Sequence, residues 1–83
     1  MTLDQLGCGE EARIASIDGG LGIRRHLEAL GLYPGDRIKL VQVSAFRGPV
    51  LVETGGRRLA IGRGVASRVL VHAPAAAGRV EGR

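Results

Sequence analysis

The feature that most constrains the fold is the stretch 27–36, Leu-Glu-Ala-Leu-Gly-Leu-Tyr-Pro-Gly-Asp. Ile23, Leu27 and Leu30 recur at i, i+4 and i+7, which predicts a helix with one apolar face. Gly31 follows at once, where a left-handed residue ends a helix without the steric penalty of a Cβ. The spacing therefore predicts a helix over 21–30 that stops abruptly.

A tight turn follows at residues 33–36, Tyr-Pro-Gly-Asp. Pro34 fixes φ at the second position of a type II turn, and Gly35 accepts the positive φ at the third. A helix thus ends and a strand begins within six residues. This structural joint is expected to rest on Leu27, Leu30, Gly31, Pro34 and Gly35.

The remaining pattern predicts short strands separated by turns. In the first strand Ala12, Ile14 and Ser16 fall on one side. Gly55-Gly56 indicates a type I′ hairpin, because both central residues of that turn need positive φ. The five predicted strands span 11–17, 37–44, 50–52, 57–61 and 68–72.

The second predicted strand, 37–44, does not keep a single phase. Ile38 and Leu40 share one face, whereas Val41 and Val43 share the other. Either both faces of this strand are buried, or a bulge changes the phase partway along.

This order of elements predicts an all-β fold with one short helix, a small partly open barrel of about five strands. An OB-fold usually has its helix between strands three and four; here it lies between strands one and two, which favours an SH3-like barrel. A length of 83 residues is enough for a single domain. We expect that domain to span 1–73 and the aperiodic segment 74–83 to be a disordered tail.

Composition narrows the classes of ligand. The net charge is +4, which suits nucleic acid, anionic lipid or simple solubility. Tyr33 and Phe46 are the only aromatic residues, too few for the stacking platforms of nucleic-acid barrels or the aromatic grooves that bind proline-rich peptides. The sequence therefore favours a protein partner, bound through aliphatic side chains and arginine, over nucleic acid.

Residues able to hold a metal or perform catalysis are scattered. Cys8, His26 and His72 lie far apart, and His26 is the best candidate for a surface metal site, although none is expected. No cofactor motif or nucleophile motif is present. The single cysteine and the lack of a signal peptide or a ~20-residue apolar run favour a cytoplasmic protein without direct membrane insertion.

Several motifs in order resemble the FeoA family, ferrous-iron transport protein A. The longest is 24–36, Arg-Arg-His-Leu-Glu-Ala-Leu-Gly-Leu-Tyr-Pro-Gly-Asp, in which His26 stands where the family often has arginine. The likeness continues at Gly48-Pro49, at 59–63 and at 66–71. The resemblance implies a non-enzymatic SH3-like protein that assists or regulates iron uptake by binding the cytoplasmic part of FeoB, the ferrous-iron permease. It would then be peripheral at the inner membrane through that partner.

Arg24, Arg25 and Tyr33 are the predicted partner-binding residues, since two cations and an aromatic side chain stand beside a rigid joint. Weak self-association is also compatible with the sequence. Two alternatives stay open: the regulatory SH3-like module of iron-dependent repressors, and a basic nucleic-acid-binding barrel. The first is disfavoured because the sequence begins with its own Met and has no helix-turn-helix.

Overall fold

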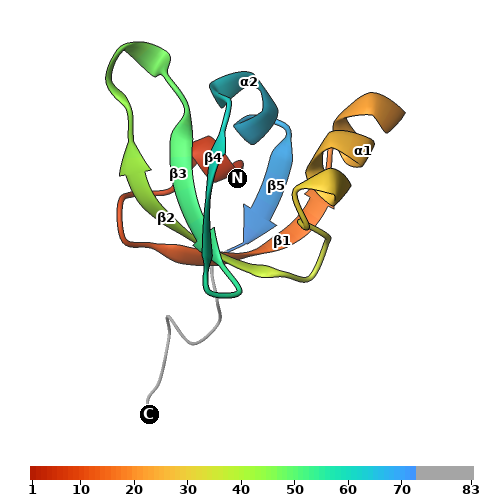
Figure 1. The fold of residues 1–83 in the computed structure, drawn as a ribbon, viewed down its shortest axis with the longest axis horizontal. Coiled ribbons are helices and arrows are strands. Elements are labelled where there is room, and N and C mark those ends of the chain that lie inside the picture. Colours follow the sequence, from red (N-terminus) through yellow and green to blue (C-terminus); the bar gives the residue numbers. More distant parts are fainter. Residues whose placement is uncertain (73–83) are drawn as a thin grey trace.

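The computed structural model describes residues 1–72 and shows five strands, two α-helices and two 3₁₀ turns (Figure 1). The predicted disordered tail, 74–83, lies outside the described residues. None of the described helices is long and apolar enough to cross a membrane. In chain order the elements are η1 (Leu3–Gln5), β1 (Glu11–Ile17), α1 (Leu21–Ala29), β2 (Arg37–Val43), η2 (Ala45–Arg47), β3 (Val50–Thr54), β4 (Arg57–Ile61), α2 (Arg63–Ala66) and β5 (Val69–His72).

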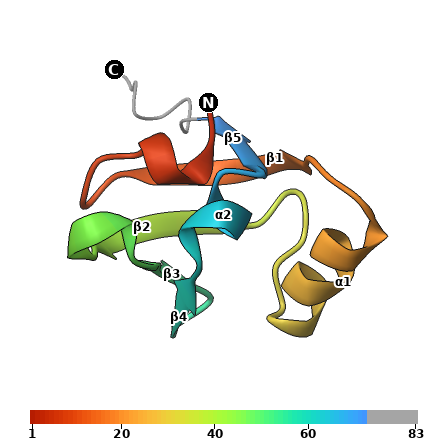
Figure 2. The same cartoon turned by 90° about the horizontal axis from the view of Figure 1, so that it is seen from above.

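The strands form one antiparallel sheet in the order β4-β3-β2-β1-β5, which curls into a partly open barrel (Figures 1 and 2). The N-terminal residues line the outer edge of β5, where Thr2 bridges Leu70 and the Val71 amide donates to the Met1 carbonyl at 2.8 Å. The architecture confirms the predicted β-rich fold with an early helix between the first two strands.

The core is aliphatic and continuous, and it fills the inside of the curled sheet. Every strand contributes side chains that are nearly inaccessible to solvent, and α1 adds Leu27 at 0% exposure. Leu3 from the N-terminal turn is equally buried and closes the barrel. The buried set is Leu3, Leu6, Ala12, Ile14, Ile17, Leu27, Leu32, Ile38, Leu40, Val50, Val52, Ile61, Ala66, Val69 and Val71.

Two bulges explain the imperfect alternation of the sequence. One lies between Ile14 and Ser16 where β1 pairs with β5, so Ser16 is exposed and Ile17 takes the buried place; the prediction for Ser16 was wrong. The second shifts the register between Leu40 and Gln42 where β2 pairs with β3. Of the two explanations offered for the second strand, the bulge is therefore confirmed.

The later connections follow the predicted turn chemistry with small changes of boundary. Gly55 and Gly56 have φ of 56° and 79°, as a type I′ hairpin requires. The third strand runs two residues further than expected, to Thr54, whose hydroxyl donates to the Arg37 carbonyl at 2.7 Å. The connector after β4 forms the single-turn helix α2.

An unusual turn connects β2 and β3. Phe46 and Arg47 both adopt left-handed backbone conformations, with φ of 58° and 62°. The Phe46 side chain is fully exposed, at 101%. A bulky residue in the left-handed region is strained, so this turn combines a conformational cost with an aromatic ring that packs against nothing in residues 1–72.

Candidate functional site

The joint between α1 and β2 is built as a Schellman motif. Gly31 has a φ of 84° and donates its amide to Glu28, while the Leu32 amide reaches back to the Leu27 carbonyl, both at 2.9 Å. Leu27 and Leu32 are completely buried, which supplies the apolar contact that accompanies this cap. The end of the helix is therefore held by backbone bonds and by the core together.

Arg57, the first residue of β4, reinforces the same helix end. Its Nη1 atom donates to the Leu30 carbonyl at 3.2 Å. Its Nη2 atom lies 2.7 Å from the point where a Cβ on Gly31 would stand. A side chain at position 31 would thus have to displace the guanidinium that bonds the helix terminus.

The following turn is fastened to β1. The Asp36 amide donates to Tyr33 at 3.1 Å, which closes the turn, and Gly35 at φ 97° fits its third position. The Gly35 amide donates to the Ile14 carbonyl at 2.7 Å, and Arg13 Nη1 donates to the Gly35 carbonyl at 3.1 Å. These bonds fix the turn, and with it Tyr33, relative to the sheet.

The three predicted partner-binding residues all face solvent on this rigid frame. Arg24 and Arg25 are exposed on α1, and Tyr33 is 48% exposed at the turn. Leu21, at the start of α1, adds an apolar side chain that is 61% exposed and that the sequence pattern did not single out.

A small hollow of about 100 Å³ separates α1 from β1. Arg24 and Glu28 line it from the helix, and Ser16, Ile17 and Pro34 line the opposite side. The i,i+4 spacing of Arg24 and Glu28 predicts a supporting ion pair. That pair is not among the two ion pairs found in residues 1–72, so this prediction was wrong and the Arg24 guanidinium stays available.

The residues considered for metal binding remain apart. Within the described part of the chain, no three His, Cys, Asp or Glu side chains gather at one place. His26 is exposed on α1 and Cys8 is a free, exposed thiol.

The outer face of the sheet carries two rows of charged residues that sequence reasoning missed, because strand register decides them. In the mixed row, defined as Glu11, Lys39, Glu53 and Arg58, each residue stands opposite one of the other sign. The cationic row, defined as Arg13 and Arg37, lies next to it, and Arg13 stands opposite Arg37 on β2 and His72 on β5.

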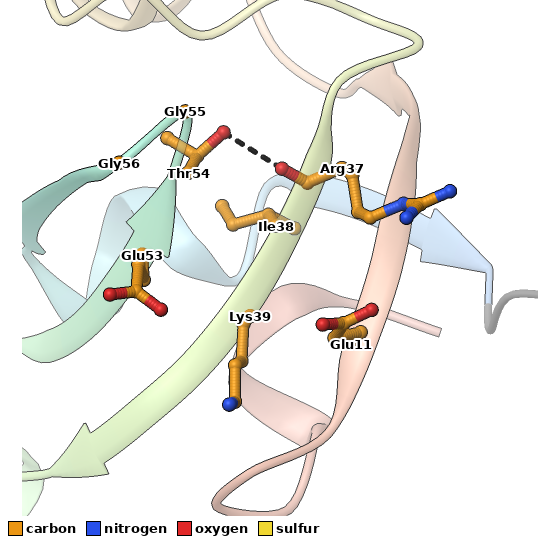
Figure 3. Close-up of a pocket in the computed structure, with 8 residues that line it drawn as sticks. All are labelled: Glu11, Arg37, Ile38, Lys39, Glu53, Thr54, Gly55 and Gly56. Atoms are coloured by element: carbon orange, nitrogen blue, oxygen red, sulfur yellow. Dashed lines mark hydrogen bonds between the residues drawn. The ribbon is translucent and has the colours of Figure 1, made fainter.

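An open hollow of about 370 Å³ lies over the centre of this face (Figure 3). It is bordered by Arg37, Lys39 and Glu53 and by the Gly55-Gly56 hairpin. Figure 3 shows the Arg37 guanidinium turned toward β1 and away from Glu53, while Lys39 and Glu11 lie beside each other.

Comparison with known proteins identifies the family. The family model for the FeoA domain matches residues 1–73. A protein of Methanocaldococcus jannaschii, named as a candidate Fe(2+) transport protein A, is 36% identical over 63 residues, which are 76% of this chain and 74% of that protein.

Similarity to solved structures of FeoA proteins supports the same family. The crystal structure of an iron uptake regulatory protein, FeoA, matches with a TM-score of 0.79 at 36% identity, over 87% of this chain and 93% of that one. The zinc-complexed FeoA of Stenotrophomonas maltophilia, described as an SH3 domain protein, matches at 0.73 and 32% identity, over 87% and 89% of the two chains. The SH3-like fold is thereby confirmed.

The alternative of a repressor module receives support at the level of fold alone. The manganese regulator SloR matches with a TM-score of 0.80 but at 22% identity, over 89% of this chain and 34% of that one. The family match spans all the described residues, and the identity to the two FeoA structures above is higher. We conclude that the chain belongs to the FeoA family, which is related to ferrous-iron transport.

Proposed function

We propose that this chain is an accessory factor of ferrous-iron uptake, which acts by binding the cytoplasmic part of a FeoB-type permease rather than by catalysis. The family match over residues 1–73 carries the proposal. The S. maltophilia relative has been suggested to be a transport activating factor, which supports a role exerted on another protein. In this role the chain works in the cytoplasm and reaches the inner membrane through its partner.

We further propose that the partner meets the outer side of α1 and the adjoining turn. Arg24, Arg25, Leu21 and Tyr33 are exposed there, on a frame held by the Schellman motif and the β1 contacts. Rigid presentation favours binding, because little side-chain and backbone freedom is then lost when the partner docks. Arginine and tyrosine are also the residue types enriched where binding energy concentrates.

The test compares two double charge reversals by affinity capture of the permease's cytoplasmic part. Arg24→Glu with Arg25→Glu alters the proposed surface, whereas Lys39→Glu with Arg47→Glu makes the same change of net charge elsewhere. We expect the first variant to weaken binding about tenfold or more at a thermal stability near that of the parent. The second should change binding less than about threefold, although it should melt at a lower temperature because the new carboxylate at position 39 stands opposite Glu11 and Glu53. If only the second variant lost binding, the contact with the permease would instead lie on the sheet and the Phe46 turn.

A further inference from the structure

The cationic row is an unusual arrangement for the surface of a small sheet. Residues directly opposite on neighbouring strands have Cβ atoms about 4.5–5.5 Å apart, and like charges so placed destabilise the pair. Arg13 and Arg37 are both exposed and stand directly opposite each other in register. The adjacent mixed row shows that the same strands also carry the alternating signs expected of a solvated face.

No carboxylate of the described chain neutralises this row. The ion pairs in residues 1–72 are Arg58 with Glu53 at 3.5 Å and Arg68 with Asp18 at 4.0 Å, and neither includes Arg13 or Arg37. The nearest carboxylates in register, Glu11 and Glu53, both stand opposite Lys39.

The two arginines of the row differ in how far their side chains are already held by hydrogen bonds. Arg13 is anchored by its bond to the Gly35 carbonyl, so part of its rotamer freedom is already lost. Arg37 has its backbone carbonyl held by Thr54, but its guanidinium makes no hydrogen bond or ion pair to residues 1–72. That guanidinium turns toward β1, the strand that carries Arg13, and away from the Gly55-Gly56 hairpin on the far side of the 370 Å³ hollow (Figure 3).

We propose that the cationic row binds an acidic, extended segment of a protein partner, with carboxylates received by Arg13 and Arg37. Alternate side chains of an extended peptide lie on one face about 6.6–6.8 Å apart, close enough for two carboxylates to reach arginines on adjacent strands. Arginine receives carboxylates through paired, charge-assisted hydrogen bonds. This surface is separate from the outer side of α1, and the inference stands whether or not a permease is the partner.

Base stacking separates the two anionic ligands, because Glu11 and Glu53 in the mixed row would repel a phosphate backbone and an acidic peptide alike. The described part of the sheet's outer face offers no aromatic platform for bases, since Phe46 stands on a turn and Tyr33 beside α1. An acidic peptide needs no such platform, which favours it over nucleic acid.

The experiment is a titration of the ¹⁵N-labelled full chain with a hexaglutamate peptide at low ionic strength, followed by amide chemical shifts. We expect the largest changes at Arg13 and Arg37, which face each other on β1 and β2. Arg37→Gln should weaken binding about tenfold, whereas Lys39→Gln, which removes one positive charge from the same strand and face, should change it less than about twofold. Equal losses in both variants, or changes centred on α1, would overturn the proposal.

Two further measurements separate the alternatives. A single-stranded oligothymidine that binds more tightly than hexaglutamate, with the same dependence on Arg37, would replace the acidic peptide with nucleic acid. Without ligand, Arg37→Gln should raise the melting temperature by about 1–5 °C, because it removes like-charge repulsion. A lower melting temperature instead would show that Arg37 is already neutralised within the chain and would count against the site.

Discussion

Gly31 is the residue at which backbone and side-chain constraints coincide. Its φ of 84° lies where a β-branched residue is strained, and Arg57 already occupies the space that a side chain needs. Gly31→Val is therefore expected to lower the free energy of unfolding by more than ~1 kcal/mol, measured by urea denaturation.

Gly22 supplies the matched control for that substitution. It lies within α1 with open space around its Cα, so Gly22→Ala should stabilise the chain by about 0.5–1 kcal/mol. A Gly31→Val variant as stable as the parent would show that α1 does not end in the left-handed cap.

Phe46 presents the opposite case, a large side chain where glycine would fit better. Its left-handed φ of 58° costs conformational free energy, and its ring does not offset this by packing, because it is 101% exposed. We expect Phe46→Gly to raise the free energy of unfolding by about 1 kcal/mol. Phe46→Ala keeps a Cβ in the strained conformation and should leave it nearly unchanged. If both variants were destabilised, the ring would have to pack on the folded chain.

At the scale of elements, α1 and the β3–β4 hairpin are joined through one arginine. Arg57→Ala removes the bond to the Leu30 carbonyl and should cost about 0.5–1.5 kcal/mol, with faster hydrogen exchange in the last turn of α1. Arg58→Ala is the control, because its ion pair with Glu53 is solvent-exposed and such pairs contribute little. Unchanged exchange at the end of α1 in the Arg57 variant would contradict this role.

Some elements were predictable because their signals are local. Ile23, Leu27 and Leu30 define one face of α1, and the turn at 33–36 follows from proline and glycine chemistry. The bulge between Ile14 and Ser16 was missed because it arises from the pairing of β1 with β5. A local alternation pattern contains no information about where a distant partner strand shifts.

The same limit applies to the candidate surfaces. The sequence predicts Arg24, Arg25 and Tyr33 as a surface because they adjoin a recognisable joint, and the structure places them in solvent. It does not bring Arg13 and Arg37 together, since they lie 24 positions apart and meet only through the register of β1 and β2. Composition identifies Phe46 as one of two aromatic residues, but its backbone conformation follows from how β2 and β3 are joined.

At the scale of the molecule, the N-terminal turn is part of the core although it belongs to no strand. Leu3 is 0% exposed, and the adjoining residues bond to β5. Leu3→Ala is therefore expected to lower the free energy of unfolding by about 2–5 kcal/mol. Leu21→Ala, at 61% exposure, should cost less than about 0.5 kcal/mol. Similar losses in the two variants would show that Leu3 does not fill the barrel.

The Arg57 contact has a mechanical consequence. The side chain that steadies the last turn of α1 starts from the same hairpin that borders the hollow over the sheet. If this arginine were displaced, the Leu30 carbonyl would lose that donor, while the backbone bonds of Gly31 and Leu32 would still hold the helix end. A displacement of the β3–β4 hairpin would therefore reach the platform of Arg24 and Arg25 through this one side chain.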